Sequence, residues 1–575
     1  MSAFDRIATT TRVRRRRLAG LSLLVVGAVA VSFPADAGAD AHPPSSLTSQ
    51  TRVFGFATAT KTTTKISTKT TKTSTKRKST KKVAAKPTTT TTTSTIPNTT
   101  TSTIPGTTTI PSPSPSPSPT TAPAAVATAS FGPCTNSSLD CANISVPLDH
   151  ANPGGAAVML FVSRRRADQS RRLGVLFVNP GGPGGPAYDT VRSASTFLTP
   201  EVLDRFDIVG VDPRGTQRSA PLICDSVRTI RTSRLSAAEQ LAQACAATDS
   251  ERLRYMDTET AARDLDVVRA AIGEEKIAFL GMSYGTYLGS VYQSIFPDRV
   301  ASMVLDSAID PSRFGVNMLV DPVIATERAL DAFFLECSSG RLKPCAFNDG
   351  SDLNAKYLAL REKSISGSRN GRELATQRFD ETIADLVGYP RNGWPILARA
   401  LEELQRTGRG DFQATAADNL ASSNDERPAS LDSFSTATNV AITCRDGILP
   451  RDAPADQLAR EQIAVVGPRF SGLAANAQAA NTCETWSAAS ANLVPLKPAT
   501  SALLVIGNTY DLTTPYPWSE ALSRTLNAPL LTRNGGGHVA VNKSACIREA
   551  VARLLIDRVA PVPGTVCSPD LSNPT

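Results

Sequence analysis

Short runs of consecutive apolar residues alternate with amphipathic segments from residue 131 onward. The apolar runs lie at 156–167, 173–182, 206–215, 276–283, 300–308 and 499–508. Most of them are apolar at successive positions, as are parallel strands that are buried on both faces of a sheet. Residues 258–273 and 543–559 have helical spacing instead. This alternation predicts an α/β fold with a mostly parallel central sheet and helices on both faces.

The alternation stops between residues 312 and 494. The segments "DPVIATERALDAFFLEC", "SDLNAKYLALREK" and "WPILARALEELQRTG" all have helical spacing. We therefore expect a helical cap or lid, inserted between an N-terminal part of the core at 131–311 and a C-terminal part at 495–575.

The first 130 residues have a different composition. Residues 1–39 combine an arginine cluster, the apolar run "LAGLSLLVVGAVAVSF" and small-residue cleavage sites, which is typical of a signal peptide. An uncleaved membrane anchor is the alternative, although the apolar run is short for a span of about 20 residues. Residues 40–130 are rich in Thr, Ser, Pro and Lys and predict a disordered linker, or stalk. We therefore expect a secreted or cell-surface protein.

The net charge of the 575-residue chain is +9, but it is unevenly distributed. Residues 1–130 contain 17 Lys+Arg and 3 Asp+Glu, a net charge of +14, so the remainder carries −5. The folded part thus gives no indication of a nucleic-acid partner. The lysines of the stalk suit an electrostatic contact with wall polymers or a membrane, and a solvated spacer is the alternative.

The ten cysteines fit an exported protein because disulfides persist in oxidising compartments. They fall into five couples that are close in sequence, and we expect five short-range disulfides, a connectivity that the sequence alone does not prove. The couples are Cys134/Cys141, Cys224/Cys245, Cys337/Cys345, Cys444/Cys483 and Cys546/Cys567. There is no C-x-x-C pair and only three histidines, so we expect no metal site.

A candidate nucleophile lies in "IAFLGMSYGTYLGS", residues 277–290. The pattern G-x-S-x-G is weak by itself, but here an apolar strand precedes it and an apolar helix follows. That is the setting of a nucleophile elbow, in which a sharp turn exposes the serine hydroxyl above the sheet. Ser283 is therefore the predicted nucleophile, and a glycine-rich turn with a capping serine is the alternative.

A serine nucleophile needs a base, and the imidazole of that base needs an acid. His42 lies in the stalk and His150 precedes the candidate serine, so His538 in "RNGGGHVAVN" is the predicted base. The chain order Ser, Asp, His favours Asp511, in the turn-rich "NTYDLTTP" after a strand. Asp306 and Asp310 are rival acids.

The oxyanion of the reaction needs backbone donors that are already in place. We expect one to be the N–H of Tyr284 and the other to be that of Gly182, with Gly181 as second choice, in "NPGGPGGPA". A phosphate-binding loop is the alternative, but the sequence lacks G-K-[S/T] and lacks G-x-G-x-x-G before a helix.

Ten ordered motifs resemble those of secreted actinobacterial tripeptidyl aminopeptidase-like serine hydrolases, which are relatives of proline iminopeptidase with a TAP-like C-terminal segment. They include "NPGGPGG", "GVDPRGTQRS", "GMSYGTYLG", "FPDRVASMVLDSAIDP", "AITCRDG", "CETW" and "GGGH". The resemblance covers about residues 131–575. It implies an α/β-hydrolase fold with a helical cap and a Ser283–Asp511–His538 triad. The sequence departs from the family at Pro186, Gln217 and "NTYD", which affects the expected substrate and leaves the triad intact.

The first hypothesis is an exopeptidase that releases short peptides from a free N-terminus through an acyl-enzyme. The second is a carboxylesterase that acts on cell-wall or lipid acyl esters, since the same triad serves both reactions. The third is a non-catalytic wall-binding protein on a hydrolase scaffold. The expected partner is a short peptide or ester substrate, and the mechanism needs no cofactor.

Overall fold

The structure is a computed structural model that describes residues 128–135, 137–222, 224, 237–366, 371–408, 436–474 and 483–568. The predicted signal peptide and all but the last three residues of the predicted stalk lie outside these ranges. Their export and wall-contact roles, and the domain boundaries given above, stay predictions.

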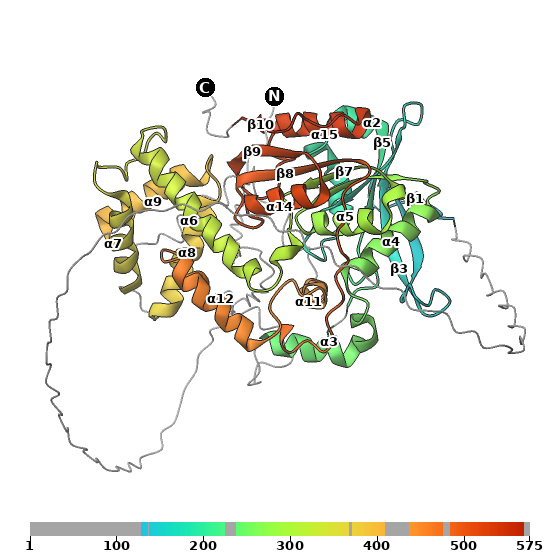
Figure 1. The fold of residues 1–575 in the computed structure, drawn as a ribbon, viewed down its shortest axis with the longest axis horizontal. Helices are drawn as coiled ribbons and strands as arrows, with labels where there is room; N and C mark the ends of the chain where they lie inside the picture. The colour runs from blue at the N-terminus through green and yellow to red at the C-terminus, as the bar shows by residue number, and fades with distance from the viewer. Residues whose placement is uncertain are drawn as a thin grey trace, which may run out of the picture. The chain divides into compact units, whose positions relative to one another are not determined.

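One sheet of ten strands runs through the described part of the chain (Figure 1). Its order is β1-β2-β3-β5-β4-β6-β7-β8-β9-β10. The strands are β1 (Gly132–Pro133), β2 (Asp140–Pro147), β3 (Ala157–Arg165), β4 (Gly174–Asn179), β5 (Phe206–Val211), β6 (Ile277–Met282), β7 (Val300–Asp306), β8 (Ala502–Tyr510), β9 (Leu530–Gly536) and β10 (Val566–Cys567). The pairs β1/β2, β2/β3 and β3/β5 are antiparallel, and all pairs from β5 to β10 are parallel.

Helices follow or connect most of these strands. They are α1 (Tyr188–Arg192), α2 (Pro200–Arg205), α3 (Ala237–Leu253), α4 (Thr258–Ala271), α5 (Tyr284–Ile295), α6 (Asn317–Ser338), α7 (Leu353–Ser366), α8 (Arg372–Val387), α9 (Gly393–Thr407), α11 (Thr436–Arg445), α12 (Ala453–Val466), α14 (Tyr516–Leu526) and α15 (Ala545–Asp557). Short 3-10 turns are η1 (Ala194–Thr196), η3 (Pro297–Arg299), η4 (Pro311–Arg313) and η6 (Ser471–Leu473).

Both faces of the sheet are covered, which explains the consecutive apolar residues of its central strands. In β4, Val175 and Phe177 pack into the hydrophobic cluster that contains residues of α4, α5 and α14. Leu176 and Val178, on the opposite face, pack into the cluster that contains residues of α1, α2 and α15. Helices α2 and α15 accordingly lie across the sheet from α5 and α14 (Figure 1). The predicted α/β fold, with a mostly parallel sheet and helices on both faces, is confirmed.

The antiparallel edge was not predicted. Strand β2 alternates between buried and exposed side chains, and it pairs with β3 from Asp140↔Arg164 to Pro147↔Ala157. Its sequence, "DCANISVP", contains few of the large apolar residues that mark the central strands. A strand near the edge of the sheet with one solvated face needs fewer apolar residues, so β2 was missed.

Between β7 and β8 the described residues form helices and 3-10 turns without a strand. This is the helical content expected of a cap, and α6, α8, α9 and α12 lie together beside the sheet in Figure 1. Trp394 at the start of α9 is fully buried and packs edge-to-face on Tyr510 at the end of β8, with 5.6 Å between ring centroids. In the described part of the chain no helix is both long and apolar enough to cross a membrane.

Candidate active site

Ser283 occupies a strained turn between β6 and α5. Its backbone has φ 56° and ψ −126°, a conformation that costs an L-residue free energy and persists only where the surroundings enforce it. Glycines on both sides permit the turn, because a Cβ on Gly281 would overlap the carbonyl of Gly285 and one on Gly285 would lie 2.7 Å from Asn179 Oδ1. In the fully described stretch 277–294, Ser283 is the only residue that is not buried. The turn therefore directs this side chain out of the core.

The imidazole of His538 pairs with the carboxylate of Asp511. His538 follows β9, and its Nδ1 lies 3.0 Å from Asp511 Oδ2 and 3.1 Å from Oδ1. The Asp511 side chain is buried, whereas that of His538 is 19% exposed. A carboxylate acceptor at Nδ1 favours the tautomer with its proton there, which leaves Nε2 available as a base.

The carboxylate of Asp511 is held by its own loop. Thr513 N and Thr514 N donate to Oδ1 at 3.0 and 2.9 Å, and Thr514 Oγ1 donates to Oδ2 at 3.0 Å. Burial raises the pKa of Asp511, but the charge and hydrogen bond of His538, with the donors of Thr514 and Ser307, bring that pKa below its ordinary value. Asp511 is therefore ionised over the neutral pH range.

The glycine loop after β4 lies against the nucleophile turn. A Cβ on Gly181, which has φ 93°, would come within 2.5 Å of Met282 O and 2.9 Å of Ser283 Cβ. The N–H of Gly181 is donated to Asn179 Oδ1 at 2.9 Å, so it is already used within the loop. That use favours Gly182 over Gly181 as the donor from this loop. Tyr284 is the first residue of α5, where N–H groups and the helix dipole favour a negative charge.

Comparison with known proteins identifies the family. Residues 174–367 match the family described as "alpha/beta hydrolase fold", and residues 469–567 match "TAP-like protein". The serine protease Hip1 of Mycobacterium tuberculosis is 30% identical over 74% of this chain and 87% of its own. The tripeptidyl aminopeptidase of Streptomyces lividans is 29% identical over 75% and 84%, and carboxylesterase B of M. tuberculosis 30% over 75% and 86%.

The chain belongs to the TAP-like α/β hydrolases. The resemblance stated from the ordered motifs is thereby confirmed. These relatives include two peptidases and a carboxylesterase at nearly equal sequence identity. Sequence similarity by itself therefore does not distinguish peptide from ester substrates.

The rival acids of this TAP-like hydrolase have other roles. The carboxylate of Asp306 accepts the backbone N–H groups of Ala540 at 2.9 Å and Val541 at 2.8 Å. Burial raises the pKa of Asp306 to about 6, against the lowering effect of those bonds and of His538. Asp310 caps η4 by accepting from Ser312 N and Ser312 Oγ. Of the three candidate acids, only Asp511 has a hydrogen bond to the His538 side chain in the structure.

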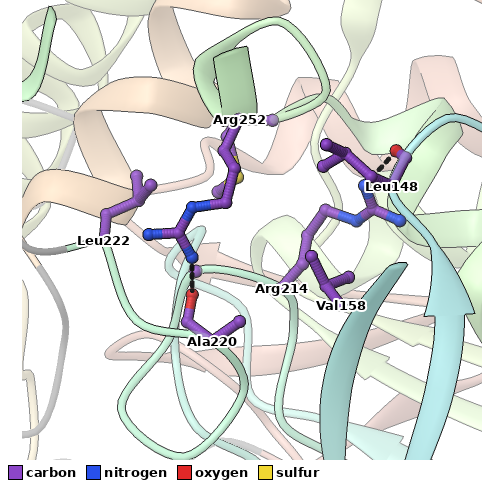
Figure 2. A pocket seen from close by; sticks show the side chains of 8 residues that line it. Leu148, Val158, Arg214, Ala220, Leu222 and Arg252 are labelled. Atoms are coloured by element: carbon purple, nitrogen blue, oxygen red, sulfur yellow. Dashed lines mark hydrogen bonds between the residues drawn. The ribbon is translucent and has the colours of Figure 1, made fainter. Parts of the chain in front are cut away.

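His150 belongs to a different network. Its Nε2 lies 2.8 Å from Asp264 Oδ1, and Asp264 also accepts two hydrogen bonds from Arg214, at 2.6 and 2.7 Å. Arg214 points into a small cavity and donates to Leu148 O (Figure 2). The cavity volume of about 10 Å³ is roughly the space of one water molecule. None of the predicted catalytic residues lines it, and we interpret this network as structural.

Two cap segments contact the loops that carry the candidate catalytic residues. Asn439 Nδ2 on α11 donates to Pro183 O in the glycine loop at 2.9 Å. Between α8 and α9, Gly388 O accepts the N–H of Gly537 at 2.7 Å, next to His538. The cap therefore supports these loops as well as lying beside them.

Sequence reasoning missed several residues around the site. Asp446, just after α11, accepts from Thr258 N at 3.1 Å and Thr258 Oγ1, and that hydroxyl also bonds the phenol of Tyr284. No local pattern indicates this contact, because the residues are far apart in sequence. Thr514 could have been found, since Asp followed by Thr-Thr-Pro is typical of a turn in which the carboxylate accepts backbone N–H groups.

The ten cysteines are joined in the five couples given above. Disulfides link Cys134–Cys141, Cys224–Cys245, Cys337–Cys345, Cys444–Cys483 and Cys546–Cys567. No cluster of three or more His, Cys, Asp or Glu that could hold a metal occurs among the described residues.

Proposed function

We propose that this TAP-like hydrolase is an exported serine exopeptidase that releases short peptides from a free N-terminus. The observation that carries the proposal is the hydrogen bond between His538 Nδ1 and the buried, ionised Asp511. Asp306 connects the His538–Asp511 pair to Ser283. Its backbone carbonyl accepts the N–H of Ser283, and its carboxylate accepts the N–H groups that follow His538.

In the proposed reaction, Ser283 Oγ attacks the carbonyl carbon while its proton passes to His538 Nε2. The N–H groups of Tyr284 and Gly182 stabilise the negative oxygen of the tetrahedral intermediate. His538 then protonates the leaving amine, which departs and leaves an acyl-enzyme. Water, deprotonated by His538, attacks the acyl group and releases Ser283. Asp511 holds the imidazole and stabilises the imidazolium throughout.

The peptidase assignment is supported by the relatives that are named a serine protease and a tripeptidyl aminopeptidase. The helical segments that pack on the glycine and histidine loops suit a substrate that enters by its end. Export is supported by the five disulfides, which need an oxidising compartment. The second candidate is a carboxylesterase, and it is favoured by the relative of that name.

The test compares kcat/KM of the purified oxidised protein on a tripeptide anilide with a free amine, the same anilide N-acetylated, and a short-chain p-nitrophenyl ester. Ser283→Ala should lower turnover by a factor on the order of 10⁶. Ser170→Ala, at an exposed serine, is the matched control and should leave turnover unchanged.

Preference for the free-amine anilide, lost on acetylation, supports the exopeptidase. Turnover of the ester alone would replace it by the carboxylesterase. If Ser283 is not labelled by a fluorophosphonate and no substrate is turned over, the protein is instead a non-catalytic member of the fold, as in the wall-binding hypothesis.

A further inference from the structure

The dipeptide Asp306-Ser307 lies at the C-terminal end of β7, between the strands that carry Ser283 and Asp511. Both side chains are fully buried. The N–H of Ser307 donates to Ile506 O in β8, and the carbonyl of Asp306 accepts the N–H of Ser283. The dipeptide is thus hydrogen-bonded to the turn of Ser283 on one side and to β8, the strand before Asp511, on the other.

The side chain of Ser307 accepts two hydrogen bonds. Its Oγ accepts from Val539 N at 2.9 Å and from Asn508 Nδ2 at 3.0 Å. A hydroxyl has two acceptor positions and one proton to donate. Both acceptor positions of Ser307 are therefore occupied, and this hydroxyl also contributes to lowering the pKa of Asp511.

The turn after His538 is strained and depends on the same dipeptide. Val539 has φ 70°, which is unfavourable for a β-branched residue. The three successive N–H groups of Val539, Ala540 and Val541 are accepted by Ser307 Oγ and by the carboxylate of Asp306. These bonds hold the backbone beside His538 in its unusual conformation.

We propose that Ser307 is a positioning residue of the catalytic triad, which, together with Asp306, holds the turn that carries His538. This inference rests on the function proposed above. Ser307 is fully buried beneath the site, so it acts through the turn of His538 and does not touch the substrate.

The experiment uses two substitutions that remove the same hydroxyl. Ser307 has φ 60°, a conformation natural to glycine, so Ser307→Gly relieves backbone strain and should fold, whereas Ser307→Ala keeps the strain. If the hydroxyl positions the triad, kcat per fluorophosphonate-titrated site should fall about 10- to 100-fold in both variants, because the N–H of the strained residue Val539 loses its acceptor. KM should stay within about twofold, because ground-state binding does not involve Ser307.

A matched control is Ser302→Ala, at the other end of β7. Ser302 is equally buried, and its hydroxyl accepts a hydrogen bond from Arg558. This variant should lose thermal stability but keep kcat per titrated site.

Wild-type kcat per titrated site in both Ser307 variants, with activity still dependent on Ser283, would overturn the inference and leave the proposed function standing. Recovery in Ser307→Gly but not in Ser307→Ala would also overturn it, because backbone strain would then be the cause. Absence of Ser283-dependent turnover in the wild-type protein would instead refute the proposed function.

Discussion

Asp446 couples the cap to the nucleophile helix, and its titration predicts how stability depends on pH. The carboxylate is fully buried and is bonded to Thr258 N and Oγ1. Burial raises the pKa of Asp446 to about 7, the bonds from Thr258 oppose that rise, and the nearby charge of Asp257 adds to it. Folding therefore favours the protonated, neutral carboxyl.

The sign of the effect follows from proton binding. A carboxyl whose pKa is raised in the folded state binds more protons there than in the unfolded chain, so its stabilising contribution is present at low pH. That contribution is lost as the pH rises through about 7. A rise in the pKa of Asp446 from the ordinary value of 3.8 to about 7 changes the free energy of unfolding by about 4 kcal/mol in all. About 2–3 kcal/mol of this change falls between pH 5 and pH 8.

Asp446→Asn tests this reasoning because the amide mimics the neutral carboxyl. Its carbonyl can accept from Thr258 N, and its NH₂ group can donate to Thr258 Oγ1. Relative to wild type, the free energy of unfolding of the variant should rise by about 2–3 kcal/mol from pH 5 to pH 8. Urea unfolding at four pH values across that range, with disulfides intact, measures the difference. Asp298→Asn, at an exposed aspartate in η3, is the control.

A difference between Asp446→Asn and wild type that does not change with pH would refute this account. A difference that becomes smaller toward pH 8 would show that the ionised carboxylate is the stabilising form, and the argument from burial would then be wrong.

Three further predictions concern catalysis. Asp511→Asn should lower kcat by a factor on the order of 10⁴, because the amide no longer favours the required tautomer of the histidine, whereas Asp310→Asn should change kcat less than about threefold. Gly181→Ala should lower kcat by about 10²- to 10³-fold, since the added methyl displaces the oxyanion loop, and wild-type activity of this variant on the ester and anilide substrates would contradict this. Asn439→Ala should lower kcat/KM by about 3- to 10-fold through loss of one hydrogen bond to Pro183 O, and Asn439→Asp, which cannot donate, should match it. Steady-state kinetics on the substrates named above measures all three.

Local sequence was sufficient wherever the feature depends on neighbouring residues. The turn at Ser283 follows from the glycines two positions away on each side, whose Cβ atoms would not fit. The central strands follow from apolar residues at consecutive positions, since each such strand buries both faces. The disulfide couples follow from closeness along the chain. Strand β2, next to the short edge strand β1, was missed because its solvated face leaves only a weak apolar signal.

Tertiary structure decided what depends on contacts between distant residues. Asp306 ends β7, Asp310 follows it and Asp511 follows β8, and chain order favoured Asp511 but left the other two as rivals. Only the folded chain turns the carboxylate of Asp306 to the backbone after His538, and that of Asp511 to its imidazole.

The same holds for Ser307, which nothing in its local sequence distinguishes. Its role arises because β7 ends between the loops of Ser283 and Asp511, and because the turn at Val539, more than 200 residues later, returns to it. Hydrophobic periodicity reports which face of a strand is buried, so the sequence by itself determined the central strands, the helical segments named from their spacing and the nucleophile turn. The direction of a buried hydroxyl or carboxylate depends on which distant donors meet it, and those are brought together only by the tertiary structure.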